Sequence, residues 1–519
     1  MASSAQITGA WILVILYMTG ILILVFRGAA KTKSISDYAL GNILFSPVAV
    51  GLSLAASMTS AATFVINPGF IANYGISGFL SYGVFLPLAA VMSLIVLTKN
   101  FRKYGQTVRA LTLAQWIGDR YNNKGYAFFM GLLALLLITF IVLIVVALSK
   151  VISSALNVNE IYVMVFIVLF VFGYMMFGGA NSMVYTNTIQ AIIMLVVAVI
   201  LLTSGYKHFS DGFNGFFQKL LDIDPALVNV PNPGSPLFRN LYEIIFAQIV
   251  VGIAIVVQPH IITKSLLLKK ESDVNRFLAT AVIAEMIFFF VVFAGLYARL
   301  TFPDLTADGV PLPVDGIIPA YVVKIFAGGS LSVVIGIFVV LGLISAGMST
   351  LEGLVQSVST TITSDIIKPI VGKDRLNDRS LVIINKAAIV LLAVITIFLS
   401  YRQLISPKLS VGIFAQNGVY AYFSAAFIPV IFGIFVKDAK IQAPLIASIT
   451  AIMVHFSVYY ILPAGVNAYG WHFGAFTQFL EGSVRNPAIA SSSAIVASSI
   501  VGILVYLVQR SKKDKVQSL

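Results

Sequence analysis

The sequence predicts an all-α membrane protein with about thirteen transmembrane helices and a core of two inverted five-helix repeats. Of its 519 residues, 59% are hydrophobic and only 10% are charged, and the mean hydropathy is +0.98. Apolar runs of roughly 20 residues, each long enough to cross a bilayer as a helix, recur along the whole chain. These runs lack the strict alternation of apolar and polar residues that marks barrel strands, so we expect helices throughout.

The apolar runs are joined by short connections and carry no soluble module. The thirteen predicted spans are Gln6–Phe26, Phe45–Phe70, Ile76–Leu97, Tyr126–Ser149, Ile161–Phe177, Thr186–Ser204, Leu241–Thr263, Phe277–Leu300, Gly329–Gln356, Leu381–Tyr401, Val411–Phe435, Pro444–Leu462 and Ile489–Val508. We therefore predict one integral domain over 1–519, composed of an added first helix with its loop (1–44), a first repeat (45–205), a second repeat (206–436) and two added helices with a basic tail (437–519).

Two of the spans, the second and the seventh, carry signs of an interrupted helix. Phe45–Phe70 is rich in small and hydroxylated residues and ends with Asn67-Pro68-Gly69, and Leu241–Thr263 holds Gly252 and ends with Gln258-Pro259-His260. Each begins a block of five spans, and an odd number of spans makes the second block run in the opposite direction. Interrupted helices in matching positions of two inverted blocks indicate a binding site near the middle of the membrane.

The net charge of +13 reflects membrane topology rather than nucleic-acid binding. With the amino terminus outside, 23 of the 33 Lys and Arg fall in inner loops and the carboxyl-terminal tail, nine fall outside, and Lys386 begins a helix on the inner side. The acidic residues of the loops divide evenly between the two sides. This positive-inside bias predicts a multi-pass protein of the plasma (inner) membrane with a cytoplasmic carboxyl terminus.

Two adjacent hydroxyls, Ser349-Thr350, lie within the apolar run Gly329–Gln356, with Ala346 one helical turn earlier. Hydroxyls are poor lipid-facing groups, but a small hard cation is bound well by neutral oxygens. Carbonyls freed by an opened second helix would add to such a set. Together the two segments suggest a sodium site and a sodium-driven transporter.

Five strings, in order along the chain, resemble those of the sodium:solute symporter family. They are Ser36-Asp-Tyr-Ala-Leu-Gly41, Gly178-Gly179 with Val184-Tyr185-Thr186-Asn187-Thr188-Ile189-Gln190, Gln258-Pro259-His260-Ile261, Met348-Ser349-Thr350 and Ala425-Ala426-Phe427-Ile428-Pro429. The resemblance implies two inverted five-helix repeats with one helix added before them and two after.

The resemblance also implies the ligands of one sodium ion, the only cofactor that we expect. They are the backbone carbonyls of Ala56, Thr59 and Ala346 and the hydroxyls of Ser349 and Thr350. Five neutral oxygens replace the hydration shell of sodium without a full charge, so the ion can be released when the helices separate. The alternative is that the two hydroxyls only bond back to the preceding turn of their own helix.

One carboxylate and one amide raise the question of a second ion. Asn187 stands where many relatives carry an aspartate that helps to hold a second sodium in some of them, and Glu352 lies three residues after Ser349 on the same helical face. Glu352 either restores the missing charge for a second sodium, or carries a proton, or is solvated or paired near the cytoplasmic end. For Glu285, in the eighth span, we expect a solvated or ion-paired residue.

By the same resemblance, a solute lies beside the sodium, between the second, third, seventh and eleventh spans. The candidate substrate-binding residues are Ser60, Thr63, Gln248, Val251, Ile255, Gln416 and Asn417. This mostly apolar set with a few amides and hydroxyls leads us to expect a monocarboxylate or similar small organic anion, since a bound cation and opened helix ends favour a negative group. Lys150 either adds to that attraction or extends to the membrane interface.

We therefore expect a secondary active symporter that uses the inward sodium gradient to accumulate a small organic solute, with the lipid bilayer as its surroundings. An enzyme is not expected, because the chain has no cysteine, four scattered histidines and no nucleotide-binding glycine loop. Two alternatives stay open: a solute sensor that uses a transporter fold, and a proton-coupled carrier that works through Glu352.

Overall fold

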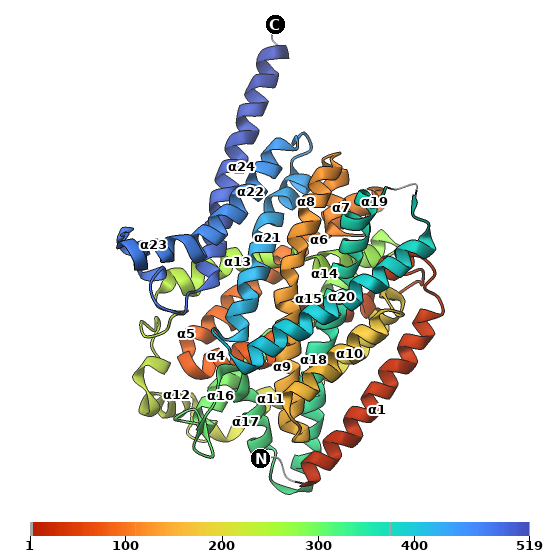
Figure 1. Cartoon of the computed structure of the whole chain (residues 1–519). Helices are drawn as coiled ribbons and strands as arrows, with labels where there is room; N and C mark the ends of the chain where they lie inside the picture. The colour runs from red at the N-terminus through yellow and green to blue at the C-terminus, as the bar shows by residue number, and fades with distance from the viewer. Residues whose placement is uncertain (1–3, 109, 373–374, 518–519) are drawn as a thin grey trace.

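The computed structural model describes residues 4–108, 110–372 and 375–517 as a bundle of helices with one short hairpin (Figure 1). The first half contains α1 (Ser4–Ala29), α2 (Ile35–Leu40), α3 (Pro47–Met58), α4 (Asn67–Tyr74), α5 (Ile76–Phe79), α6 (Leu86–Val108), α7 (Leu113–Arg120), α8 (Lys124–Ala134), α9 (Ile138–Leu156), α10 (Glu160–Met175), α11 (Ala180–Ser204) and α12 (Gly212–Ile223). The second half contains α13 (Gln248–Ile255), α14 (Pro259–Ile262), α15 (Val274–Phe290), α16 (Ala294–Thr301), β1 (Thr306–Ala307), β2 (Val310–Pro311), α17 (Ile317–Ile325), α18 (Gly329–Thr361), α19 (Lys368–Val371), α20 (Asp378–Ile405), α21 (Val411–Phe435), α22 (Gln442–Phe456), α23 (Leu462–Tyr469) and α24 (Pro487–Gln517).

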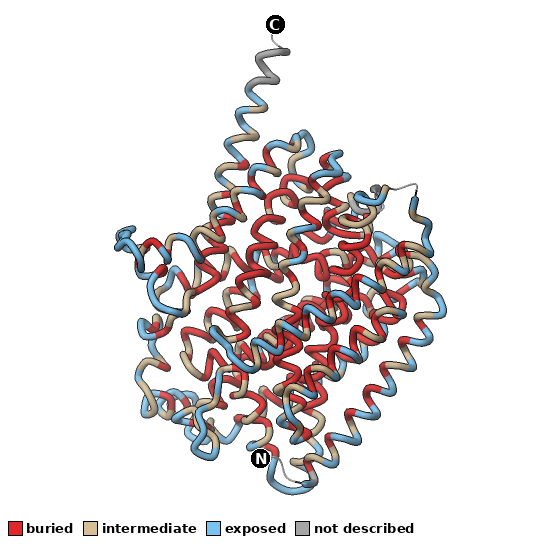
Figure 2. Tube along the Cα trace, viewed as in Figure 1, coloured by how far each residue is buried: buried red, intermediate tan, exposed pale blue. Residues whose placement is uncertain are grey.

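Buried residues are concentrated in the middle of the bundle, and the outward faces of the outer helices are exposed (Figure 2). Many of the exposed side chains are large and apolar, among them Leu16 and Phe26 of α1 and Val394 and Phe398 of α20. In water such a surface would promote aggregation, whereas in a bilayer it faces lipid tails. The exposed surface of this bundle is therefore that of a membrane protein.

Within the described residues, ten helical segments are long and apolar enough to cross a membrane, and two further spans are each a pair of helices bent at a break. α10 is apolar but only 16 residues long, so it does not meet the same length criterion. The structure thus gives ten to twelve candidate spans, and the total of thirteen remains a prediction. The proposed boundaries of the two repeats also remain predictions.

Both expected interruptions are present, in the second and the seventh predicted spans. α3 and the helical segment Ala62–Tyr74 meet at an angle of 52°. The break occupies 59–61, well before Pro68, so the proline does not cause it. Ser60 instead begins the second segment, because its hydroxyl accepts the backbone N–H of Ala62 at 3.0 Å.

The second interruption is caused by a proline. Tyr242–Ile255 and Pro259–Leu267 meet at 56°, and Gln258 has an extended backbone with φ −65° and ψ 137°. Proline has no N–H and disfavours the helical conformation of the residue before it, so the helix stops here. The predicted break at Gln258-Pro259 is confirmed.

The long helix α18 runs through the centre of the bundle and packs along α11 and α9, while α3 packs between α11 and α15. α1 lies at the edge of the bundle (Figure 1). The amino-terminal end of α1 and the carboxyl-terminal end of α24 lie at opposite ends of the molecule, as an odd number of crossings requires (Figure 1).

Two glycines allow helices near one end of the bundle to approach to backbone contact. A Cβ atom on Gly295 of α16 would lie 2.2 Å from the carbonyl oxygen of Pro68, and one on Gly69 would lie 2.0 Å from the carbonyl oxygen of Val314. Small residues of this kind let membrane helices pack closely. α4 is therefore held tightly against α16 and against the turn that precedes α17.

The orientation in the membrane can be tested with single cysteines, because the chain has none of its own. We chose Asn100→Cys, on the exposed end of α6, and Asn214→Cys, on exposed α12. If the amino terminus is outside, an impermeant maleimide added to intact cells labels the 214 variant and leaves the 100 variant unlabelled until the cells are permeabilised.

The opposite labelling pattern would reverse the orientation. The parent chain is the control for background labelling, and equal labelling of both variants after permeabilisation shows that both cysteines are reactive.

Candidate functional site

The first part of the site is the interrupted end of α3, where backbone carbonyls lose their helical partners. Thr59, the residue after α3, has φ −99° and ψ 103° and so leaves the helix. Hydroxyls of α18 reach the freed carbonyls. Ser349 Oγ donates to the Ala56 oxygen at 2.7 Å, and Thr350 Oγ1 donates to the Ser57 oxygen at 3.2 Å.

The same hydroxyls also face the carbonyl oxygen of Ala346, at 3.1 Å from Ser349 Oγ and 3.3 Å from Thr350 Oγ1. The four residues that carry these oxygens, Ala56, Ala346, Ser349 and Thr350, are all 0% exposed. Two carbonyls and two hydroxyls from two helices therefore meet in a buried place, as four of the five predicted sodium ligands. Their oxygens carry the lone pairs that a hard cation requires. The hydroxyls contact both α3 and their own preceding turn.

The fifth predicted ligand, the backbone carbonyl of Thr59, lies at the break, and the side chain of Thr59 contacts a different helix. Thr59 Oγ1 donates to Oε2 of Glu285 on α15 at 2.7 Å. Glu285 is 0% exposed, and among the described residues it has no ion pair and its Oε1 has no hydrogen-bond partner. The prediction that Glu285 is solvated or ion-paired is therefore wrong. An incompletely satisfied carboxylate instead lies beside the predicted sodium site.

A second carboxylate, Glu352, lies on α18 about one turn after Ser349 and is also 0% exposed. Its Oε1 accepts the hydroxyl of Tyr174 at 2.6 Å and the amide of Gln190 at 3.3 Å, and its Oε2 accepts the hydroxyl of Thr186 at 2.6 Å. The alternative of a solvated residue near the cytoplasmic end is therefore wrong. Asn187, the predicted companion of Glu352, is buried beside it on α11.

The solute-binding residues were predicted to line one cavity, and four of the seven do. Ser60, Thr63, Ile255 and Gln416 line a cavity of about 80 Å³ that begins at the break in the second span. The full lining is Met58, Ser60, Ala62, Thr63, Ile66, Asn67, Tyr82, Leu86, Phe140, Leu143, Ile255, Gln258, Phe289, Gly412, Ala415, Gln416, Val419 and Tyr420. None of these lining residues is charged.

The other three predicted residues lie outside this lining, and their role in solute binding stays a prediction. Gln248 and Val251 are 0% exposed on α13, which packs against α6. Asn417 follows Gln416 on α21 but points to a different helix, because its amide donates to Tyr460 at 2.5 Å and its oxygen lies 3.0 Å from Nε2 of His455.

Lys150 follows neither of the two alternatives that the sequence suggested. Its ammonium forms an ion pair with Asp315 at 3.1 Å, and both side chains are largely buried. The lysine is therefore neutralised by a carboxylate next to the α17 helix. We therefore no longer expect Lys150 to attract a negatively charged solute.

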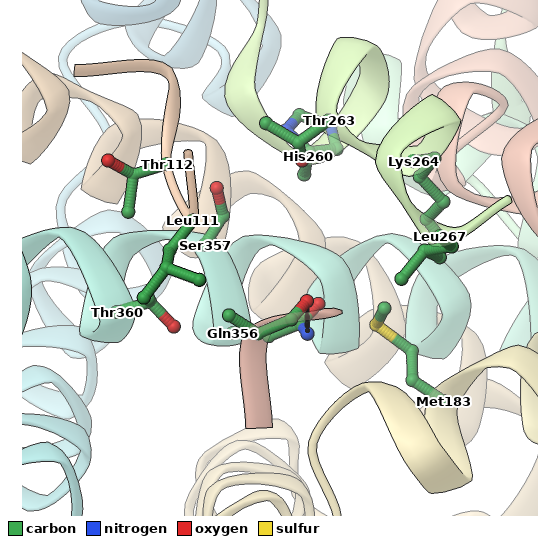
Figure 3. Close-up of a pocket in the computed structure, with 11 residues that line it drawn as sticks. Leu111, Thr112, Met183, His260, Thr263, Lys264, Leu267, Gln356, Ser357 and Thr360 are labelled. Atoms are coloured by element: carbon green, nitrogen blue, oxygen red, sulfur yellow. Dashed lines mark hydrogen bonds between the residues drawn. The ribbon is translucent and has the colours of Figure 1, made fainter. Parts of the chain in front are cut away.

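A smaller cavity is lined in part by the second half of the seventh span (Figure 3). His260 and Lys264 of that segment line it together with Gln356 and Thr360 of α18. Lys264 was assigned to an inner loop from the sequence, but it is only 3% exposed. This placement was missed because the apolar run appeared to end at Thr263.

A family comparison decides the assignment of the chain. The model of the sodium:solute symporter family matches residues 38–451. The chain belongs to this family. The sodium/pantothenate symporter of Haemophilus influenzae is 25% identical over 420 residues, covering 79% of this chain and 82% of that protein. A sodium/proline symporter of Staphylococcus aureus is 24% identical over 451 residues, covering 83% and 82% of the two chains.

A solved structure of a Na⁺-coupled sialic acid symporter, in a substrate-bound outward-open state, superposes with a TM-score of 0.72 at 16% identity. The superposition covers 96% of this chain and 98% of that one. The predicted fold class is confirmed: this sodium:solute symporter is an all-α membrane protein with the inverted-repeat core of these transporters.

The predicted sodium ligands can be tested by removing both hydroxyls. In the variant Ser349→Ala/Thr350→Ala we expect sodium-stimulated uptake into proteoliposomes to be lost, since no side-chain ligand would remain. Each single variant should be milder, because one neutral ligand contributes on the order of 1–3 kcal/mol. Sodium-dependent thermal stabilisation of the purified protein measures the same loss without transport.

The control is Thr203→Ala/Ser499→Ala, which removes two hydroxyls that bond only to their own helices, at 2.8 and 3.1 Å and at 2.6 Å respectively. It should keep both readouts. An unchanged sodium dependence in the Ser349/Thr350 variant would refute the assignment.

Proposed function

We propose that this symporter couples the inward movement of sodium to the uptake of a small organic anion carrying one carboxylate. Sodium binds between the end of α3 and α18, and the solute occupies the cavity that begins at the same break. The observation that carries the proposal is the lining of that cavity, which is polar in places but contains no charged residue.

A carboxylate in such a cavity needs a positive partner, because an unpaired charge in an apolar environment is costly. The cavity offers hydroxyls and amides from residues such as Ser60, Thr63 and Gln416, but no ammonium or guanidinium. A sodium ion at the end of α3 supplies the missing charge. Solute and ion then stabilise each other in the site, which is the physical basis of coupled transport.

The relatives support this choice of solute class. Their names give pantothenate, proline and sialic acid as substrates, and each of these molecules carries a carboxylate. Pantothenate and sialic acid also share hydroxyls and an amide, but proline has neither, so the carboxylate is the group that one sodium site can recognise in all three. In our proposal the protein resides in the plasma (inner) membrane with its amino terminus outside.

The proposal is tested by uptake of radiolabelled short monocarboxylates, amino acids and their uncharged amides into proteoliposomes. We expect an inward sodium gradient to accelerate uptake of at least one carboxylate, with no effect of an equal potassium gradient. The amide of that solute should neither enter nor compete. Equal competition by the amide would overturn the carboxylate assignment, and equal uptake in potassium would overturn sodium coupling.

The cavity assignment predicts the effect of Gln416→Leu. Loss of one solute hydrogen bond worth about 1.4 kcal/mol should raise the half-saturating solute concentration roughly tenfold. Sodium-dependent thermal stabilisation should not change, because Gln416 is not a sodium ligand. The matched control is Gln403→Leu on α20, whose amide bonds to the Leu409 carbonyl and lies outside the cavity lining. An unchanged solute affinity in the Gln416 variant would contradict the cavity assignment.

A further inference from the structure

Among the residues that the structure describes, Lys264 is the most deeply buried lysine, with 3% of its surface exposed. Its ammonium donates to the Ser53 hydroxyl at 2.7 Å and to the Ser53 carbonyl at 3.1 Å. Ser53 lies one turn before Ser57 on α3, and the Ser57 carbonyl accepts the hydroxyl of the sodium-site residue Thr350. The buried ammonium is therefore about one helical turn away from the predicted sodium site.

The third partner of the ammonium is the side-chain amide of Asn187. The oxygen and nitrogen of an amide are nearly equal in size, so their positions are assigned from the hydrogen bonds that they make with their neighbours. In the orientation that satisfies both ends, its oxygen accepts from Lys264 Nζ and from Ser57 Oγ, each at 3.0 Å. Its nitrogen donates to Glu352 Oε2 and to Gln190 Oε1, each at 3.0 Å. The amide thus links a buried cation to a buried anion.

Every hydrogen-bond donor of Lys264 and every acceptor position of Glu352 has a partner. An ammonium has three donors, and those of Lys264 go to the two oxygens of Ser53 and to Asn187. A carboxylate has about four acceptor positions. Those of Glu352 take the hydroxyls of Tyr174 and Thr186 and the amides of Gln190 and Asn187.

A sodium ion at Glu352 would need oxygen lone pairs that are directed at the ion. In this network the lone pairs of Glu352 point at four N–H and O–H donors, and the amide oxygen of Asn187 points at the ammonium. The positive charge that the carboxylate requires is already covalently attached to the protein. This arrangement differs from Glu285, which keeps one oxygen without a partner among the described residues.

We propose that the ammonium of Lys264 takes the place of a second bound cation, so that Glu352 holds a fixed charge of the protein and the transporter binds one sodium per cycle. This inference rests on the proposed sodium-coupled function and answers the question that Asn187 raised. In this chain Lys264 and Asn187 replace the second sodium ion and the aspartate that some relatives use. With a solute of charge −1, one sodium makes the transported pair electrically neutral.

Lys264 also borders the smaller cavity, together with His260 and Gln356 (Figure 3). The link between Lys264 and Glu352 therefore adjoins that cavity. A cation entering this cavity would meet the positive charge of Lys264.

The test counts sodium ions in the purified protein by equilibrium binding of ²²Na⁺, and compares four proteins. We expect one ion per chain in the parent protein and in Lys264→Arg, which keeps a positive charge. In Lys264→Met the carboxylate loses its partner, so a second ion should bind and the Hill coefficient for sodium in uptake should rise above one. In Lys264→Met/Glu352→Gln both charges are gone, and the count should return to one.

Two bound ions in the parent protein would overturn the inference and leave sodium coupling intact. One ion with unchanged sodium dependence in folded Lys264→Met would also overturn it. If Lys264→Met does not fold, the parent count and the double variant decide, because a double variant that binds two ions contradicts the inference. No sodium binding in the parent, together with uptake that is independent of sodium, would refute the proposed function itself.

Discussion

The structure depends on one constraint, the need of every backbone N–H and C=O group within a bilayer to find a partner inside the protein. An uninterrupted helix meets this need within itself. The interruption after α3 does not, and it leaves carbonyls at a fully buried place in the bundle. The hydroxyls of Ser349 and Thr350 reach them from α18. The oxygens that we predict to bind sodium thus come together because one helix is broken beside another that carries hydroxyls.

Buried charges are under the same constraint, and leaving one unpaired costs more free energy than leaving a carbonyl unpaired. Three buried acidic side chains show three degrees of compensation. Glu352 is surrounded by donors, Asp315 is paired with Lys150, and Glu285 accepts one hydroxyl at the break and keeps one oxygen unpartnered among the described residues. Of these three, the least satisfied carboxylate is the one that contacts Thr59, where the second predicted span changes direction.

The sequence was sufficient for features that are local in the chain. Apolar run lengths revealed the spans, Gln258-Pro259 marked one break, and the adjacent pair Ser349-Thr350 pointed to the place where α18 meets α3. Features that depend on pairs of distant residues were not predictable in this way. The contacts of Lys150 with Asp315 and of Lys264 with Ser53 join different helices, and no local pattern encodes such distances. Asn417 was misplaced for a related reason, because neighbouring residues on one helix point in directions about 100° apart, and only Gln416 faces the cavity.

The glycine contacts near one end of the bundle have a consequence for how the molecule can move. With carbonyl oxygens close to the α-carbons of Gly69 and Gly295, the surfaces of α4, α16 and the turn before α17 leave no room for side chains to slide past one another. Packed surfaces without intervening side chains shift as one piece rather than deform. The second half of the broken span and these neighbours therefore form a single mechanical block. This block is joined to α3 through the short stretch 59–61, which lies between the predicted sodium ligands of α3 and the cavity.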